Sequence, residues 1–256
     1  MSDIICEQQG KLCFITMNRV AKHNAFDNAM LTELQRAIIE AENDSTIRVI
    51  ILKANGPHFS AGADLAWMQQ MVDLNEQDNI KDAMVLARMM YTLYASTKPT
   101  IAMVQGAAYG GGAGLAAACD IAIGADNARF CFSEVKLGLI PAVISPYVIK
   151  AIGERAAYEL LMTAQVIQAS RAVELNLLQH CVPLNELLIF TIHLAETIAE
   201  LPKMAVKEAK SLIRHVAGQP IDEALLLETA TRIAKRRVSD EGQDGLKSFL
   251  RKKKDV

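Results

Sequence analysis

Aromatic side chains are scarce in this sequence of 256 residues: they make up 5% of it, and Trp67 is the single tryptophan. An excess of charge of one sign is also missing, because 27 Lys and Arg residues face 29 Asp and Glu residues. The resulting net charge of −2 gives no support for a protein that binds nucleic acid or a membrane surface. Hydrophobic residues make up 51% and charged residues 22%, which excludes disorder for the bulk of the chain. We therefore expect one large globular domain or two small ones.

Cysteine and histidine patterns that bind metals are lacking as well. The five cysteines show no C-x-x-C spacing and no histidine at the spacing of a zinc site, so we expect no metal site and predict buried, reduced thiols in a cytoplasmic protein. The five histidines are scattered, without the spacing of a metal site or a catalytic triad. The first eight residues carry Asp3 and Glu7 and lack the apolar run of a signal peptide, so we expect no leader.

Charged residues are absent from the stretch 99–119, which is long enough to cross a bilayer. The stretch contains a dense cluster of glycines, at positions 106, 110, 111, 112 and 114. Such a cluster makes a poor helix interior. We therefore predict a buried strand, a glycine turn and a buried helix here, and no membrane span.

Strand and helix patterns alternate in the first half of the chain. Short apolar or β-branched runs predict strands, and apolar residues three or four positions apart predict helices. The predicted strands are 12–17, 49–52, 100–104, 121–123 and a short one at 179–182. Helices are predicted at 28–42 and 82–94, and after Pro146 at 148–163, 170–177, 185–200, 204–215 and 221–237. This order favours the α/β class with parallel strands, followed by a helical C-terminal part.

The glycine cluster follows a predicted strand and precedes a predicted helix, a position where free backbone N–H groups attract negative charge. It matches neither a P-loop nor the G-x-G-x-x-G pattern, which argues against a nucleotide phosphate site. An oxyanion hole and a close helix–strand contact that needs small residues remain equally open. The segment 59–65 follows another strand and is also built of small residues. Two such turns could each supply one N–H group to the same carbonyl oxygen.

Three segments together resemble the crotonase superfamily, the enoyl-CoA hydratases and isomerases: Ser-Ala-Gly-Ala-Asp-Leu at 60–65, the glycine-rich segment 106–120, and Phe-Cys-Phe-Ser-Glu-Val-Lys-Leu-Gly-Leu-Ile-Pro at 130–141. The segments 18–25 and 239–252 resemble the family's N-terminal substrate segment and its last helix. The resemblance covers essentially the whole chain. It implies a crotonase-like ββα spiral core at 1–195 and a C-terminal helical trimerisation segment at 196–256. It also implies a homotrimer or a dimer of trimers.

Roles for individual residues follow from the same resemblance. The N–H groups of Ala63 and Gly111 match the family's oxyanion hole, which holds the thioester carbonyl of an acyl-CoA, and Glu134 matches its second acid/base glutamate. The resemblance places further residues at the substrate and coenzyme A: Lys22, Ala25, Ala61, Asp64, Leu65, Gly110, Phe249 and Lys252. Coenzyme A is implied as part of the substrate, and no permanently bound cofactor is expected.

One position departs from the family pattern. Typical hydratases of the family hold a water molecule between two glutamates, and the first of them falls on Gly114 here. Glu134 would therefore act alone, and burial in an apolar pocket should raise its pKa toward the range that suits acid/base work.

The closest resemblance of the segment 130–157, and of Trp67, is to bacterial hydratases that act on 3-methylglutaconyl-CoA and related branched, carboxylated enoyl-CoAs. Such enzymes serve leucine and isoprenoid breakdown, and fatty-acid catabolism is the broader setting. A substrate carboxylate needs a cationic partner, and the candidates in sequence are Lys136, Lys150 and Arg155.

We therefore predict an enoyl-CoA hydratase that adds water to a 2-enoyl-CoA and yields a 3-hydroxyacyl-CoA. A double-bond isomerase is the alternative among enzymes, and it is favoured by Gly114 because it needs a single base. A CoA- or RNA-binding protein with reduced activity is the alternative from another class, but the net charge of −2 gives RNA binding little support.

Overall fold

The computed structural model describes residues 2–252, with the side chain of Lys252 outside the described part. Two compact units make up the chain, one ending at Thr197 and the other beginning at Ile198. The predicted division between residues 195 and 196 lies two positions earlier. The role of the second unit in trimerisation stays a prediction.

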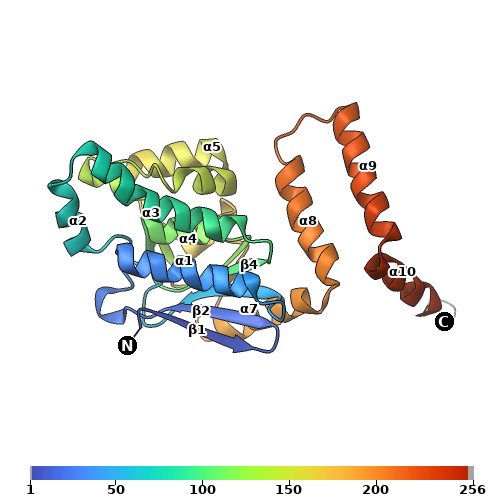
Figure 1. The fold of residues 1–256 in the computed structure, drawn as a ribbon. Helices are drawn as coiled ribbons and strands as arrows, with labels where there is room; N and C mark the ends of the chain where they lie inside the picture. Colours follow the sequence, from blue (N-terminus) through green and yellow to red (C-terminus); the bar gives the residue numbers. More distant parts are fainter. Residues whose placement is uncertain (1, 253–256) are drawn as a thin grey trace. The chain divides into compact units, whose positions relative to one another are not determined.

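A six-stranded sheet runs through the first unit (Figure 1). Its strands are, in spatial order, β1 (Ile4–Gln9), β2 (Leu12–Met17), β3 (Val49–Ala54), β4 (Thr100–Val104), β6 (Ile121–Ala125) and β9 (His180–Val182). β1 is antiparallel to β2, and all the other neighbours in this sheet are parallel. The α/β class predicted from the sequence is confirmed, because the predicted strands form the parallel part of the sheet. β1 was not predicted, since the polar run Glu7–Gln9 conceals an edge strand.

A second, smaller sheet consists of β5 (Ala107–Tyr109), β7 (Arg129–Cys131) and β8 (Ile167–Gln168). β5 and β7 are parallel, and β7 and β8 are antiparallel. Sequence analysis predicted none of these strands, because two or three residues carry too little alternation to indicate a strand. This small sheet matters for the site, since β5 leads into the glycine turn and β7 leads to Glu134.

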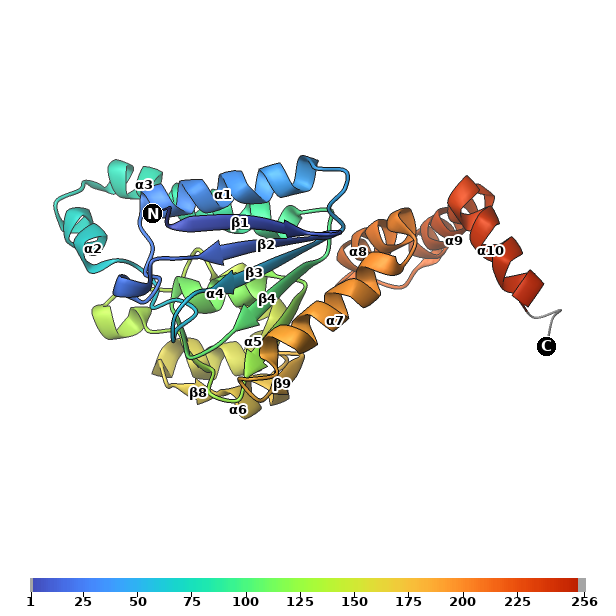
Figure 2. The same ribbon diagram turned by 90° about the horizontal axis from the view of Figure 1, so that it is seen from below.

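Helices cover the sheets of the first unit: α1 (Asn28–Asn43), α2 (Leu65–Val72), α3 (Glu76–Ala95), α4 (Gly111–Ala118), α5 (Ser145–Thr163) and α6 (Ala169–Glu174), with α7 (Leu187–Glu200) at its end. Figure 2 shows α1 and α3 side by side along the strands of the large sheet. α3 begins six residues before the predicted position because the side chain of Asn75 caps it and accepts from the Asp78 N–H. α2 was not predicted, since its apolar residues show no clear helical spacing. Two short 3-10 helices, η1 (Val20–Lys22) and η2 (Glu134–Leu137), complete the unit.

The core is aliphatic, as the scarcity of aromatics predicts. Ile50, Ile51 and Leu52 in the middle of β3 are at most 1% exposed, because α-helical and sheet layers cover both faces of the strand. The prediction of buried thiols is wrong for two cysteines: Cys6 and Cys181 are exposed. Both lie on edge strands of the large sheet, Cys6 in β1 and Cys181 in β9.

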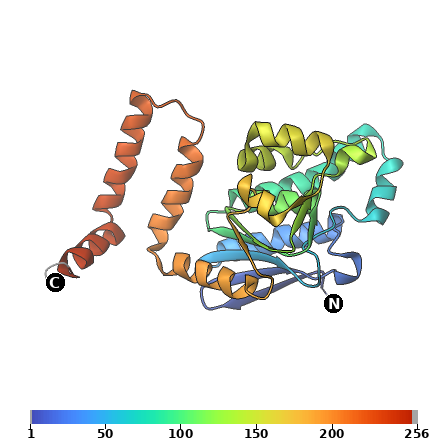
Figure 3. The ribbon, with the colours of Figure 1, turned by 180° about the vertical axis from the view of Figure 1, so that it is seen from behind.

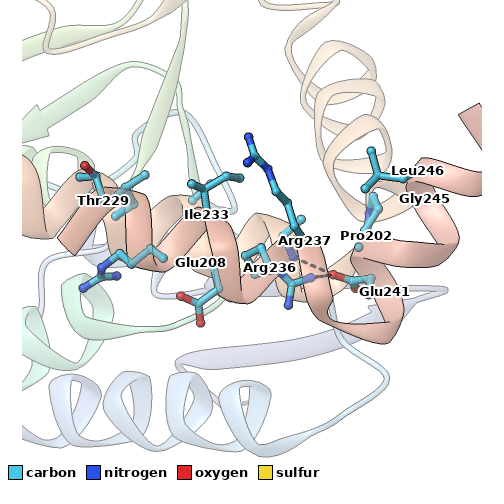
Figure 4. Close-up of a pocket in the computed structure, with 14 residues that line it drawn as sticks. Pro202, Glu208, Thr229, Ile233, Arg236, Arg237, Glu241, Gly245 and Leu246 are labelled. Carbon is cyan, nitrogen blue, oxygen red and sulfur yellow. Dashed lines mark hydrogen bonds and ion pairs between the residues drawn. The ribbon is translucent and has the colours of Figure 1, made fainter. Parts of the chain in front are cut away.

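The second unit consists of α8 (Lys203–Val216), α9 (Glu223–Val238) and α10 (Asp240–Lys252). α8 and α9 lie antiparallel and side by side (Figure 3). An apolar cavity of about 480 Å³ lies among the three helices, lined by residues such as Leu212, Ile233 and Leu246 (Figure 4). Glu241 of α10 connects the three helices of this unit. It forms an ion pair with Arg236 of α9 and accepts a hydrogen bond from the N–H of Met204 in α8 at 2.9 Å.

Within residues 2–252, none of the helices has the length and apolar character that a bilayer crossing requires.

Candidate active site

The loop after β3 places the N–H group of Ala63 in an open position. Ala63 forms a parallel β-bridge with Phe26: the Phe26 N–H donates to the Gly62 carbonyl at 2.9 Å, and the Asp64 N–H donates to the Phe26 carbonyl at 2.9 Å. In such a bridge the N–H of the residue between these two partners points the opposite way. The N–H of Ala63 is thus directed away from Phe26, as an oxyanion donor must be.

The glycine turn between β5 and α4 provides the second N–H group. Gly110 has φ of 49° and forms the N-cap of α4, and Gly111 is the first residue of the helix. The first N–H groups of an α-helix have no partner inside the helix, and the helix dipole adds positive character there. The Gly111 N–H can therefore bind an oxygen that gains negative charge.

The two loops lie against each other, although about fifty residues of sequence separate them. Ser60 and Ala108 form a second isolated bridge, in which the Tyr109 N–H donates to the Ser60 carbonyl at 2.9 Å. A Cβ atom on Gly62 would lie 3.0 Å from the Tyr109 carbonyl oxygen and 3.9 Å from Cα of Gly110. Gly62, with φ of 92°, thus brings the two donor loops into contact.

Glu134 comes to the same place from the end of β7. One of its oxygens, Oε1, lies 3.2 Å from the position that a Cβ on Gly110 would take, so the carboxyl group stands beside the glycine turn. The other, Oε2, is buried and has no hydrogen-bond partner among the described residues. Burial raises the pKa of Glu134 above its ordinary value, and a bond from its own backbone N–H offsets this in part. The expectation of a raised pKa agrees with this direction.

The space beside Gly114 is filled by apolar side chains. A Cβ on Gly114 would lie 2.3 Å from Cγ2 of Ile144 and 3.2 Å from Cε of Met90. Ile144 is 2% exposed and Met90 is fully buried. A second carboxylate therefore has no room at this position unless Ile144 changes as well.

Charged side chains cluster on the rim near η1. Lys22 Nζ lies 2.5 Å and Arg19 Nη1 lies 3.2 Å from Oδ2 of Asp64, which is 4% exposed. The hydrogen bond from Lys22 and the N–H of Ala66 hold the pKa of Asp64 below its usual value. Asp64 is thus fixed as the N-cap of α2, directly after Ala63.

The other residues predicted to contact the substrate are divided between the two units of the chain. Ala25 is buried beside the Asp64 cluster, while the Ala61 N–H donates to the His23 carbonyl at 2.9 Å and Leu65 is 80% exposed. Gly110 is buried next to Glu134. Phe249 belongs to α10 in the second unit, and the side chain of Lys252 lies outside the described residues. The placement of these last two at the substrate stays a prediction.

Sequence reasoning missed three residues of this site: Arg19, Phe26 and Ile144. Arg19 lies within the N-terminal segment already singled out and Phe26 follows it directly, but a single sequence does not reveal their partners Asp64 and Gly111. Ile144 is far from Gly114 in the sequence, and only the structure shows that the two residues are in contact. Among residues 2–252, no three His, Cys, Asp or Glu side chains gather as a metal site would require.

Comparisons with known proteins agree in one family. The sequence pattern of the family described as enoyl-CoA hydratase/isomerase matches residues 7–256. The short-chain-enoyl-CoA hydratase of Clostridium acetobutylicum is 32% identical, and the 2,3-dehydroadipyl-CoA hydratase of Escherichia coli is 31% identical; each alignment covers 99% of this chain and 97% of the relative. A crystal structure of an enoyl-CoA hydratase/isomerase (crotonase) type protein of Legionella pneumophila is 60% identical, with a TM-score of 0.95 over 98% of this chain and 97% of that one.

Proposed function

This chain belongs to the enoyl-CoA hydratase/isomerase family, the crotonase superfamily, and from this premise we propose that it hydrates a 2-enoyl-CoA to a 3-hydroxyacyl-CoA. The observation that carries the proposal is the meeting of three groups around Gly110: the N–H of Ala63, the N–H of Gly111 and the carboxyl group of Glu134. The two N–H groups suit a thioester oxygen, and Glu134 suits proton transfer next to it.

Hydration with one carboxyl group is chemically complete if Glu134 begins in its neutral form. Water forms a bond to C3 and gives one proton to the unprotonated oxygen of Glu134. The double-bond electrons move to C2, and negative charge develops on the thioester oxygen, where Ala63 and Gly111 stabilise it. The protonated oxygen of Glu134 gives its proton to C2, so the carboxyl group ends neutral with its two oxygens exchanged. The raised pKa of Glu134 favours this starting form.

The acyl group that we propose is branched or carboxylated, as in 3-methylglutaconyl-CoA, which belongs to leucine breakdown. Support comes from the Escherichia coli relative, which is named for a dicarboxylic enoyl-CoA. A second support is a contact between α3 and α5, in which the rings of Tyr94 and Tyr147 lie with their centroids 5.4 Å apart. Nζ of Lys150 lies 5.9 Å from the centroid of the Tyr94 ring. We therefore take Lys150, before Lys136 and Arg155, as the cation for a substrate carboxylate.

A double-bond isomerase is the second candidate, and the contact between Gly114 and Ile144 favours it. Moving a double bond requires one base that removes a proton from C2 and returns it to C4. Glu134 alone can do this from its ionised form. The third candidate, a CoA- or RNA-binding protein with reduced activity, gains no support from Glu134, because binding alone does not require a buried carboxyl group beside the glycine turn.

Product analysis separates the three candidates. The purified protein is incubated with crotonyl-CoA, with 3-methylglutaconyl-CoA and with a 3-enoyl-CoA, and the products are separated by chromatography and identified by mass and by the ultraviolet absorbance of a conjugated double bond. A hydratase adds the mass of water to the 2-enoyl thioesters and leaves the 3-enoyl thioester unchanged. Conversion of the 3-enoyl-CoA without added mass identifies an isomerase. Binding of the esters or of RNA without any turnover would refute both enzymes.

The assembly that we propose is a homotrimer or a dimer of trimers. The second unit supports it, because large apolar side chains are exposed on α9 and α10: Leu227 is 71% exposed and Leu250 is 58% exposed. Exposed apolar surface of this kind commonly marks a contact between subunits. The molar mass in solution tests it: three or six times 28.0 kDa supports the proposal, and a monomer refutes it.

A further inference from the structure

The separation of the two proposed oxyanion donors is not determined by either loop alone. Ala63 follows β3 and Gly111 begins α4, so the two N–H groups belong to different parts of the chain. An oxyanion needs both donors at about 2.7–3.1 Å from one oxygen atom, which fixes how far apart they can be. A residue that contacts both loops would therefore set this separation.

Phe26 is such a residue, and its backbone holds the first loop. Its N–H donates to the Gly62 carbonyl, and its own carbonyl accepts from the Asp64 N–H, both at 2.9 Å. These two bonds lie on either side of Ala63 and fix the peptide plane that carries the Ala63 N–H. The segment after Phe26 is fixed in turn, because Asp27 caps α1 and accepts from the Met30 N–H at 3.0 Å.

The ring of Phe26 holds the second loop. A Cβ atom on Gly111 would lie 2.4 Å from Cζ of Phe26 and 3.2 Å from Cε2, so the end of the ring lies directly against Cα of Gly111. Phe26 is 2% exposed, and its ring packs against Trp67 with centroids 6.5 Å apart. Trp67 is anchored itself, since its indole N–H donates to Asp82 of α3 at 2.9 Å.

We propose that Phe26 is a positioning residue that sets the distance between the Ala63 and Gly111 N–H groups, with its backbone on one donor loop and its ring on the other. The inference rests on the proposed function, because it assumes that these two groups bind the thioester oxygen. Without the ring, the start of α4 can move into the space that the ring occupied. One donor then no longer reaches the oxygen at a bonding distance. Binding of coenzyme A itself does not depend on this distance.

The test compares Phe26→Ala with the matched control Phe14→Ala. Phe14 is also 2% exposed, but it lies in β2 and does not belong to the apolar cluster that contains Phe26. The readout is the infrared C=O stretch of bound butyryl-CoA labelled with ¹³C at the thioester carbonyl. Donors that polarise the carbonyl lower its frequency, and lost core packing alone does not affect it.

We expect Phe26→Ala to lose at least half of the frequency shift and to lower kcat for crotonyl-CoA about tenfold or more, with KM changed less than about threefold. Phe14→Ala should keep the shift while losing similar thermal stability. If Phe26→Ala keeps the full shift and loses stability only as the control does, Phe26 is ordinary core and the inference is wrong. Should Phe26→Ala not fold, the pair Phe26→Leu and Phe14→Leu is compared by the same criterion. A wild-type protein that binds the ester without any shift would instead refute the proposed function.

Discussion

Cγ2 of Ile144 lies 2.3 Å from the position that a Cβ atom on Gly114 would take. The family resemblance predicts a glutamate at the position that Gly114 occupies, and Ile144 is the N-cap residue of α5. The two residues are therefore in direct contact, and the side chain of Ile144 fills the space that an acidic side chain at position 114 would use. Restoring the second carboxylate requires both positions to change.

This contact predicts a coupling between the two positions. Gly114→Ala should lower the free energy of unfolding by about 1–3 kcal/mol, because the added methyl group overlaps Ile144. Ile144→Ala in the same chain should recover most of this loss, although it is destabilising by itself. Urea unfolding followed by circular dichroism measures all three variants. Gly245→Ala is the matched control, because a Cβ there meets nothing within 4 Å and alanine favours the helix. Strictly additive losses at 114 and 144 would contradict the contact.

The pH dependence of hydration should follow the neutral form of Glu134. Burial raises the pKa of this carboxyl group, and the neutral form gives the proton to C2, so kcat/KM should fall as pH rises through the raised pKa. The residual activity of Glu134→Gln should lack this decline. A pH profile with crotonyl-CoA measures both. An isomerase starts from the ionised form, so conversion of a 3-enoyl-CoA at a rate that increases with pH over the same range would favour that candidate.

Asp64 should stabilise the fold above the pKa that it has in the unfolded chain, about 3.9. Its pKa is lowered in the folded state, chiefly by the hydrogen bond from Lys22, so this contribution is lost as pH falls through the lowered value. Asp64→Asn should therefore cost about 1–2 kcal/mol at neutral pH, and the difference from wild type should vanish in acid. Denaturation at several pH values measures it. Glu174→Gln, in an exposed pair with Arg171, is the control and should change stability by less than about 0.5 kcal/mol. A difference that persists unchanged in acid would exclude the ion pair as its cause.

Lys150 should matter for carboxylated substrates and for no others. Lys150→Met should lower kcat/KM for 3-methylglutaconyl-CoA about tenfold or more, since a charge-assisted bond to the carboxylate is lost. The value for crotonyl-CoA should stay within about twofold. Arg155→Met is the comparison within α5, on the other side of the kink at Gly153, and should affect both substrates equally. A selective loss in Arg155→Met or Lys136→Met, with Lys150→Met unchanged, would assign the carboxylate to that residue instead.

The sequence predicted the long strands well, but it predicted the short strands and the starts of some helices poorly. Strands 12–17 and 100–104 have the predicted bounds, because each run is apolar apart from one threonine and is buried along its whole length. The three strands of the small sheet were missed, since their pairing depends on partners far along the chain. The start of α3 shifted because the side chain of Asn75 caps its first turn, whereas α1, which Asp27 caps, starts at the predicted residue 28.

The candidate site shows the same limit. The residue types at Ala63, Gly111 and Glu134 were chosen from local motifs and a family resemblance. The motifs did not reveal the contacts between distant residues. These contacts are the ring of Phe26 against Gly111, the ion pairs of Arg19 and Lys22 with Asp64, and Ile144 beside Gly114. The residues in these contacts are far apart in the sequence, and their spacing follows neither the helix repeat nor the strand repeat. A single sequence therefore does not reveal them.

The rate of crotonyl-CoA hydration by Glu134→Gln, measured together with its affinity for butyryl-CoA, tests the central claim most directly. Glutamine keeps the size of the side chain but cannot exchange the two protons that hydration moves. The account predicts a fall in kcat of about 10²–10⁴-fold with an unchanged Kd for the ester. A variant that hydrates crotonyl-CoA within about threefold of wild type would contradict it, because the acid/base group would then be another residue.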